Sequence, residues 1–323
     1  MSVDFTRLQE EFKRVLLKTG FENAKADLCA RIFAENSRDG VHTHGLNRFP
    51  TFIRAVKDGL VNPSAEPERI DGMSALENWE GHLAPGISNA IHCMDRAISL
   101  ASEYGIGCVS IKNTNHWMRG GTYGWQAADA GFIGICFTNT IANVTPWGGT
   151  EPRLGNNPIV IAVPRVDGHI VLDMAVSQYS FGKMQEYKSR EEHLPFPGGY
   201  DREGKLTKEP DKIIETQRAL PIGYWKGSGL SLLVDVLLTS LSGGRSTGVI
   251  TGGGSESGVS QCFIAIKPGA GNAALVEQIL EFTKLGHPEE VRYPGESTLS
   301  KRNKHALDGI PVNEKIWNEV LNM

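Results

Sequence analysis

The chain has 323 residues, of which 40% are hydrophobic and 22% charged, and its formal net charge is −4 at pH 7. This composition is typical of a globular protein with a large core, and the slight negative charge argues against a nucleic-acid partner. The most apolar stretch, residues 230–241, contains Asp235 and is too short to cross a bilayer. The first residues lack the pattern of a secretory signal, so we expect a cytoplasmic protein with no membrane partner.

The five cysteines are scattered along the chain, and none is paired as C-x-x-C. They are Cys29, Cys93, Cys108, Cys136 and Cys262, and each lies in an apolar-patterned segment. This pattern predicts buried free thiols in a reducing compartment, in place of disulfides or a zinc cluster.

The N-terminal part has apolar residues at helical spacing. We predict helices over residues 1–14, about 24–37 and about 45–57. Gly40 and Gly59 are typical of helix ends, and Pro50 is tolerated in a first turn because its missing N–H would have no partner there.

From about residue 75 the pattern changes to short apolar runs. A helix is predicted over residues 88–104, and another over 123–130. Strands are predicted at residues 108–111, 132–137, 158–163, 170–174 and 262–266. Some connections, such as residues 164–169, are too short for a crossover helix, so we expect many antiparallel pairings.

The last third mixes helices with loops. Residues 227–241 predict a strongly apolar, buried helix, whereas 194–209 and 243–257 are typical of exposed loops. After Pro288 we predict a short extended segment at 291–293. Helices are then expected over about 297–307 and 313–321.

The first candidate site is the segment that contains His42, His44 and Arg48. If a helix begins near Gly45, His44 and Arg48 lie one turn apart and can face the same space. An arginine can bind a carboxylate while an imidazole transfers the proton of an adjacent carbonyl or alcohol. The alternatives are a capped helix start with an incidental histidine, or a metal site that uses His42 and His44.

The second candidate is the loop over residues 113–121, which follows a predicted strand. It gathers Asn113, Asn115, His116, Trp117 and Arg119 near flexible glycines. Such strand-end loops often carry functional residues. The alternative is a turn stabilised by asparagine side chains.

The third candidate is a set of glycine-rich segments at residues 146–149, 154–158 and 223–229. Lys226 at a helix start is suited to a phosphate, but tight turns explain these glycines equally well. The chain has neither a strand–GxGxxG–helix unit nor a Walker lysine loop. The residues alone therefore predict an enzyme-like α/β fold without identifying a cofactor.

Over nearly its whole length the chain resembles the malate/L-lactate dehydrogenase family, which is structurally distinct from the Rossmann dehydrogenases. The segments that carry the resemblance are His44-Gly45, Arg48-Phe49-Pro50, Asn115 to Gly121, Thr138-Asn139, Pro146-Trp147-Gly148, Asn157-Pro158, Asp173-Met174, Gly223 to Gly229 and Pro294-Gly295-Glu296. Residues 117–121 and 123–128 resemble one branch in particular, which acts on a diketo sugar acid. Thr43 and Asn156 depart from the family pattern, which more often has Ser and Thr there.

The resemblance implies an α/β fold with a non-Rossmann cofactor lobe. This lobe, residues 76–284, would bind NAD(P) and contain a large mixed, mostly antiparallel sheet. Residues 1–75 and 285–323 would form a helical lobe that contributes substrate and catalytic residues. The resemblance also implies a homodimer with the active site near the subunit interface.

The implied activity is the reduction of a small 2-keto acid with NADH, or with NADPH, and without a metal. Arg48 would hold the carboxylate and His44 would supply the proton, with His116 as the rival proton donor. Alternatives within this activity are oxaloacetate, the keto form of sulfolactate, and a cyclic imino acid. By position, the cofactor contacts would be Asn139, Thr140, His169, Ile170, Val171, Leu172, Asp173, Met174, Ala175, Trp225, Lys226, Pro294, Gly295 and Glu296.

Two other classes of function remain open at this point. One is a metal hydrolase that uses His42, His44 and His116. The other is a protein that binds a sugar acid without catalysis.

Overall fold

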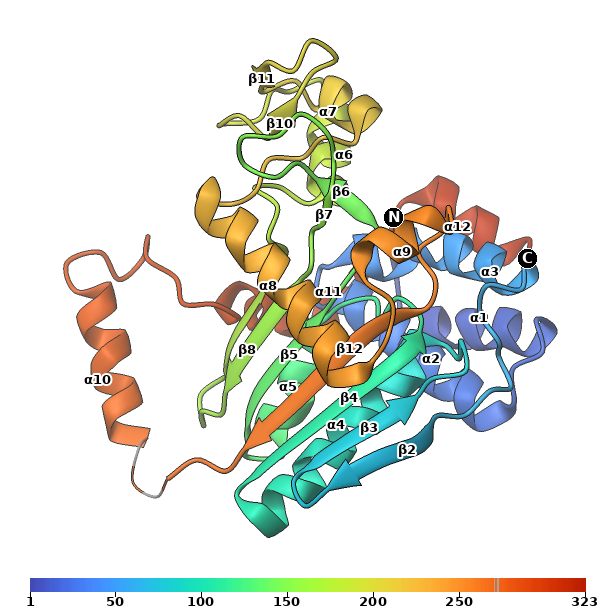
Figure 1. The fold of residues 1–323 in the computed structure, drawn as a ribbon, viewed down its shortest axis with the longest axis vertical. Helices are drawn as coiled ribbons and strands as arrows, with labels where there is room; N and C mark the ends of the chain where they lie inside the picture. Colours follow the sequence, from blue (N-terminus) through green and yellow to red (C-terminus); the bar gives the residue numbers. More distant parts are fainter. Residues whose placement is uncertain (270, 272) are drawn as a thin grey trace.

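A seven-stranded sheet forms the centre of the computed structural model, which describes residues 1–269, 271 and 273–323 (Figure 1). In spatial order the strands are β2 (Glu68–Met73), β3 (Leu76–Glu80), β4 (Ile106–Thr114), β12 (Val259–Ile266), β5 (Ile133–Thr138), β8 (Ile159–Val163) and β9 (Ile170–Met174). Only β3 and β4 pair in parallel, and the other neighbours in this sheet are antiparallel. The prediction of a mixed, mostly antiparallel sheet is therefore confirmed.

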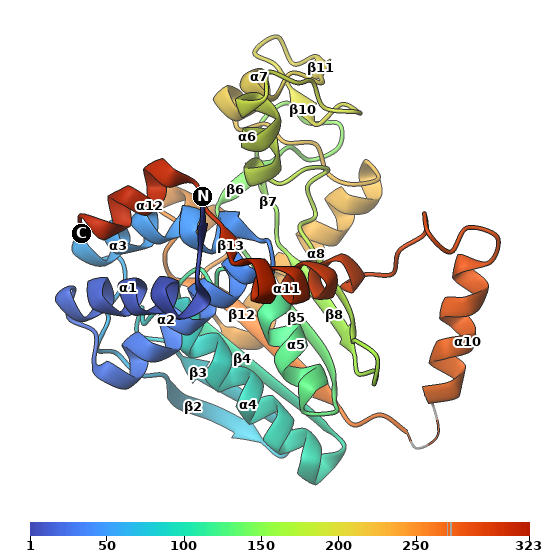
Figure 2. The same ribbon diagram turned by 180° about the vertical axis from the view of Figure 1, so that it is seen from behind.

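Helices cover both faces of this sheet because its central strands are apolar on both sides. On one face lie α4 (Gly86–Tyr104) and α5 (Gly121–Asp129), whereas α8 (Trp225–Ser242) crosses the other (Figures 1 and 2). The start of α4 is pressed against the loop after β4. A Cβ on Gly86 would lie 2.1 Å from the carbonyl oxygen of Asn115, so only glycine fits there.

The N-terminal helices α1 (Phe5–Lys18), α2 (Asn23–Arg38) and α3 (Phe49–Lys57) form a second layer with the C-terminal helix α12 (Glu314–Leu321). Their shared core is aromatic, with Phe12, Phe33, Phe49 and Trp317 all fully buried. The short strands β1 (Ser2–Val3) and β13 (Ile310–Pro311) pair antiparallel, so the beginning of the chain lies beside its C-terminal segment (Figure 2). The helix α11 (Glu296–Asp308) comes directly before β13 and α12 in the chain.

A smaller group of elements projects from one end of the sheet (Figure 1). It contains β6 (Ala142–Val144), β7 (Leu154–Gly155), α6 (Phe181–Ser189), β10 (Gly199–Tyr200), β11 (Leu206–Thr207) and α7 (Pro210–Thr216). Its own core includes Met184, Leu194 and Ile213. These strands have two or three residues each, too few to show a periodic pattern.

Several expectations need correction. The sheet begins at Glu68, within the segment assigned to the helical lobe, because the polar strand β2 pairs with β3. The expected burial of residues 227–241 is wrong on one side, since Leu232, Leu233, Val236 and Leu237 of α8 are about half exposed. The predicted loop 243–257 contains α9 (Thr247–Gly252), and the unpredicted helix α10 (Ala273–Lys284) stands apart from the sheet (Figure 1). The division into two lobes stays a prediction.

Two further predictions concern the state of the cysteines and the absence of a membrane-spanning helix. All five thiols are free, and four of them are buried. Among the described residues, no helix is both long enough and apolar enough to cross a bilayer.

Candidate active site

His44, Arg48 and His116 lie together, although His116 is far from the other two in sequence. Two 3-10 turns, η1 (His42–His44) and η2 (Leu46–Arg48), follow α2, so the helix predicted from about Gly45 begins at Phe49. His116 comes from the loop after β4, and its ring stacks on that of His44 with centroids 5.7 Å apart and planes 16° apart.

The path of η1 and η2 depends on close contact with the end of α2. A Cβ on Gly45 would lie 2.2 Å from Ser37 Oγ, so glycine is required for this approach. Ser37 Oγ accepts a hydrogen bond from the Leu46 N–H at 2.9 Å, and the Asn36 side chain donates to the His44 carbonyl at 3.0 Å. These bonds set the position of His44.

Both imidazoles are neutral at pH 7. Burial, followed by the charges of Arg48 and Arg119, lowers the pKa of His44 to about 4. Burial, followed by the charge of Arg48 and by His44, holds the pKa of His116 well below its usual value. The ligand-free site therefore carries no positive charge on its histidines.

The hydrogen bonds of the two rings differ in a way that bears on proton transfer. The Met118 N–H donates to His116 Nδ1 at 2.9 Å, which assigns the ring proton of neutral His116 to Nε2. A second proton on Nδ1 would break that bond. His44 Nδ1 faces the Thr43 hydroxyl at 3.2 Å, and a hydroxyl can donate or accept. Of the two imidazoles, His44 can therefore change protonation state without losing a partner.

Arg48 is a cationic residue of this site, and its guanidinium has no partner among the described residues. Its side chain makes no hydrogen bond and no ion pair with any residue that the structure describes, and the residue is half-buried. The positive charge of Arg48 nevertheless lowers the pKa of both imidazoles. An unpaired guanidinium beside two neutral imidazoles is suited to binding a carboxylate.

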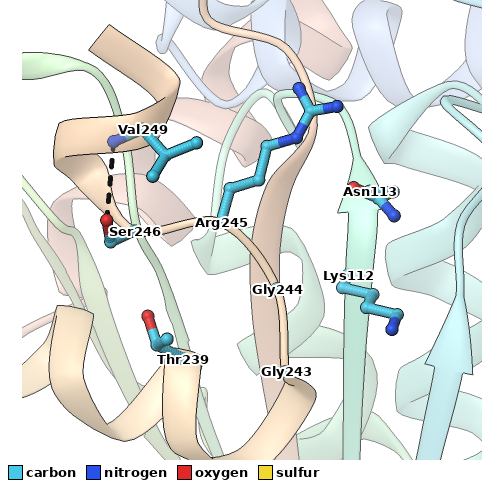
Figure 3. Close-up of a pocket in the computed structure, with 8 residues that line it drawn as sticks. All are labelled: Lys112, Asn113, Thr239, Gly243, Gly244, Arg245, Ser246 and Val249. Atoms are coloured by element: carbon cyan, nitrogen blue, oxygen red, sulfur yellow. Dashed lines mark hydrogen bonds between the residues drawn. The ribbon is translucent and has the colours of Figure 1, made fainter. Parts of the chain in front are cut away.

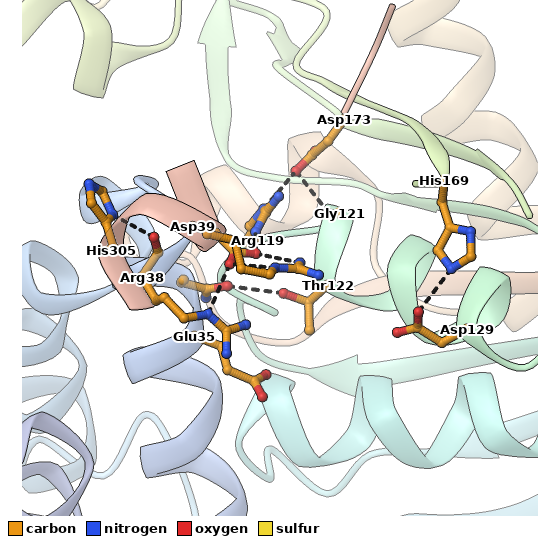
Figure 4. Close-up of polar contacts among 12 residues, drawn as sticks. Glu35, Arg38, Asp39, Arg119, Gly121, Thr122, Asp129, His169, Asp173 and His305 are labelled. Atoms are coloured by element: carbon orange, nitrogen blue, oxygen red, sulfur yellow. Dashed lines mark hydrogen bonds and ion pairs between the residues drawn. The ribbon is translucent and has the colours of Figure 1, made fainter. Parts of the chain in front are cut away.

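A buried ion-pair network, which the sequence analysis missed, lies behind this site (Figure 4). Asp39, 3% exposed, follows α2 and accepts a bond from Arg119 Nη1 at 2.7 Å. Arg302 of α11 binds the same carboxylate through two nitrogens at 2.9 and 2.7 Å. Burial by itself would raise the pKa of Asp39, but the bonds and charges of the two arginines lower it.

The network connects three parts of the chain to the imidazoles. Arg119 belongs to the same loop as His116, and its Nε lies 3.8 Å from Asp173 Oδ2 at the end of β9. The Asp173 carboxylate also accepts the Gly121 N–H at 2.8 Å. The site, the sheet edge and α11 are thereby held together.

The predicted cofactor residues at one end of β9 are brought together. The Val171 N–H donates to the Pro294 carbonyl at 2.9 Å. A Cβ on Gly295, which has a φ of 96°, would lie 3.1 Å from the His169 carbonyl oxygen. The segments around residues 169–171 and 294–296 are therefore neighbours, and the side chain of Glu296 pairs with Lys284 at 2.5 Å.

The other end of β9 lies near Trp225 and Lys226, which are both exposed at the start of α8. The Ile222 N–H donates to the Val176 carbonyl at 2.8 Å, which places this helix start beside Ala175. The hydroxyls of Thr145 and Ser177 are buried there without a hydrogen-bond partner among the described residues.

These features fit an elongated polar ligand such as a dinucleotide. The five residues of β9 span roughly 17 Å at a strand rise of about 3.3 Å per residue. Because β9 is an outer strand of the sheet, alternate main-chain groups on its free side are open to a ligand. The outward groups are those of Val171 and Asp173. Since the Val171 N–H already donates to the Pro294 carbonyl, the Val171 carbonyl and the Asp173 main-chain groups are the ones left for a ligand.

Other predicted cofactor residues have side chains that are already occupied. The buried Asn139 amide donates to Asp235 at 2.9 Å and to the Arg245 carbonyl at 2.8 Å, and its oxygen accepts the Ser260 N–H. Thr140 Oγ1 bonds Asn156 at 3.0 Å. These two side chains connect β5 to its surroundings.

The His169 ring is occupied as well. Its Nε2 bonds Asp129 at 2.9 Å, and its Nδ1 accepts the Arg165 N–H at 3.0 Å (Figure 4). Any contact of Asn139 or His169 with a cofactor would therefore use the main chain.

Two other places do not form comparable sites. The His42 ring lies 6.4 Å from that of His305, and no group of three or more His, Cys, Asp or Glu among the described residues is placed to hold a metal. A hollow of about 480 Å³ lies between the end of β4 and the α8–α9 connection. Figure 3 shows that the charged ends of Lys112 and Arg245 there point in different directions.

Comparison with known proteins identifies the family. The family model described as malate/L-lactate dehydrogenase matches residues 3–321. The chain belongs to the malate/L-lactate dehydrogenase family. This family consists of nicotinamide-dependent dehydrogenases, and the chain is accordingly an oxidoreductase.

Individual relatives cover almost the whole chain. A 2,3-diketo-L-gulonate reductase from Citrobacter koseri is 44% identical over 330 aligned positions, which cover 99% of each chain. Sulfolactate dehydrogenase from Methanocaldococcus jannaschii superposes with a TM-score of 0.89 at 30% identity, over 100% of this chain and 97% of that one. Malate dehydrogenase from Entamoeba histolytica superposes with a TM-score of 0.92 at 26% identity, over 100% and 96%.

The Asp39 network generates a prediction about stability. Replacing Asp39 by Asn removes the nearer counter-charge of the buried Arg119 and leaves only Asp173 at 3.8 Å, so we expect the free energy of unfolding to fall by about 3–5 kcal/mol. Urea denaturation measures it. Asp58→Asn is the matched control, because Asp58 ends α3 as Asp39 ends α2 but is exposed, and it should change stability by less than about 0.5 kcal/mol. Equal losses in the two variants would contradict the role given to Asp39.

Proposed function

We propose that this protein reduces 2,3-diketo-L-gulonate to 3-keto-L-gulonate, with NADH as the preferred reductant. The observation that carries the proposal is the unpaired Arg48 guanidinium beside the stacked, neutral His44 and His116. The substrate is inferred from the 44% identical relative of that name, which aligns over nearly the full length.

Arg48 binds the substrate carboxylate in this proposal. A guanidinium holds a carboxylate through two parallel hydrogen bonds, which orients the adjacent C2 carbonyl as well as attracting the anion. Because no carboxylate of the described chain forms an ion pair with Arg48, its guanidinium is available to bind the substrate.

His44 supplies the proton to the oxygen on C2. The bound carboxylate offsets the charge of Arg48, which is one of the causes that lower the pKa of His44. Substrate binding therefore raises the pKa of His44 and favours uptake of a proton. His116 keeps its proton on Nε2 and donates a hydrogen bond to the carbonyl or a neighbouring hydroxyl.

A bound dihydronicotinamide supplies the hydride that reduces C2. The residues suited to hold such a cofactor are those along β9, the neighbouring Pro294-Gly295-Glu296 segment and the exposed Trp225-Lys226 pair. The chain's own contribution is to fix the keto acid next to that strand and to provide the proton.

A panel of 2-keto acids assayed with NADH and NADPH separately tests the proposal. We expect 2,3-diketo-L-gulonate to give a kcat/KM at least about tenfold above those of oxaloacetate, sulfopyruvate and a cyclic 2-imino acid. NADH should be the better cofactor. Faster reduction of any other acid would contradict the proposed substrate, and faster reduction with NADPH would contradict the proposed cofactor.

We further propose that the protein is a homodimer built on the exposed apolar side of α8. Leu232, Leu233, Val236 and Leu237 form a continuous patch there, and such patches mark interaction surfaces. The helix α10 also exposes the apolar residues Leu275, Ile279 and Phe282, and Leu285 directly after it is exposed as well. A two-fold axis would let both surfaces be covered by a second copy of the chain. The cytoplasmic location stays a prediction.

Light scattering after size-exclusion chromatography tests the dimer. The wild type should have twice the mass of one chain, whereas Leu233→Asp should have the mass of one chain, since a carboxylate would be desolvated in the interface. Leu206→Asp is the control, because Leu206 is similarly exposed on the projecting β11. A wild type with the mass of a single chain would contradict the proposal.

A further inference from the structure

Glu256 lies beside the proposed substrate site and outside the motifs considered above. It is in the loop that leads into β12, and β12 pairs antiparallel with β4. The residues before β12 therefore run alongside the loop after β4. Ser257 Oγ hydrogen-bonds Asn115 Oδ1 at 3.1 Å, and the Gln261 side chain donates to the Asn115 carbonyl at 2.8 Å. Glu256 is thereby held next to the loop that carries His116.

The Glu256 carboxyl is half-buried and has no hydrogen-bond or ion-pair partner within the described part of the chain. It is nevertheless close enough to Arg48 to be affected by its charge. Burial raises the pKa of Glu256, and the positive charge of Arg48 partly opposes that increase. Two groups of opposite charge thus border the site without neutralising each other.

The charges around the site favour a substrate with one negative group. Arg48 can neutralise a single carboxylate. Arg119, the other buried arginine nearby, is already paired with Asp39. A second carboxylate or sulfonate on the substrate would meet Glu256 in place of a cation, and like charges at close range are unfavourable. A hydroxyl group at the same place would find a hydrogen-bond acceptor.

We propose that Glu256 determines specificity by accepting hydrogen bonds from the hydroxyls of a monoanionic, polyhydroxylated 2-keto acid and by repelling the second anionic group of dianionic acids. The inference rests on the proposed function, because it assumes that the substrate carboxylate binds Arg48. Malate and sulfolactate, which appear in the names of two structural relatives, are dianions of the kind that Glu256 would disfavour.

The test compares Glu256→Gln with the wild type. For Glu256→Gln we expect kcat/KM to rise about tenfold for oxaloacetate and to fall about tenfold for 2,3-diketo-L-gulonate, mainly through KM, since one charge and one strong acceptor are lost. Glu256→Asp keeps the charge and should keep the preference for the monoanion. Glu203→Gln makes the same chemical change at an exposed position of the projecting group and should alter neither substrate.

Calorimetric binding of L-gulonate and L-malate makes this test independent of turnover. If the wild type reduces no 2-keto acid, the proposed function fails, yet a change of binding preference toward malate in Glu256→Gln would still support the role of Glu256. The inference is overturned if the ratio of the two substrates, or of the two ligands, is the same in Glu256→Gln as in Glu203→Gln. A wild type that prefers oxaloacetate also overturns it.

Discussion

The buried carboxylate of Asp39 is the interaction on which the rest of the site depends. It pairs with both Arg119 and Arg302, which come from positions 80 and 263 residues further along the chain. Through these bonds the end of α2, the loop after β4 and α11 are fixed relative to one another. The elements that carry the stacked imidazoles of His44 and His116 are joined in this way.

Because of this network, Arg119 and Arg48 differ in whether their side chains form an ion pair. Arg119 is 5% exposed and has its counter-charge, so it contributes rigidity and a fixed electrostatic field. Arg48 has no counter-charge, so its interaction energy is available to a ligand. Burial, together with the charge of Arg48, keeps both histidines neutral in the absence of a bound anion. The difference between the rings then depends on their immediate partners, a main-chain N–H for His116 and a hydroxyl for His44. Thr43 supplies that hydroxyl.

The sequence was informative where local patterns are strong. Apolar runs predicted five strands of the central sheet, and the spacing of His44 and Arg48 predicted a shared space. The network around Asp39 could not be predicted, because a single aspartate after a helix is common and its partners are distant in sequence. The β2–β3 hairpin was missed because its residues are largely polar, and Glu256 was missed because it belongs to no motif. The apolar helix α8 was expected to be buried, since composition alone cannot distinguish a fully buried helix from one that leaves an apolar side exposed.

The central claim is that His44, and not His116, changes its protonation when a carboxylate binds Arg48. NMR titration of the imidazole signals, with and without the unreactive 2-keto acid analogue oxamate, tests it most directly. We predict that His44 titrates near pH 4 in the free protein and at a clearly higher pH with oxamate bound, while His116 stays neutral throughout. A free His44 that titrates near its ordinary value, or an oxamate-induced protonation of His116 with none at His44, would contradict the account.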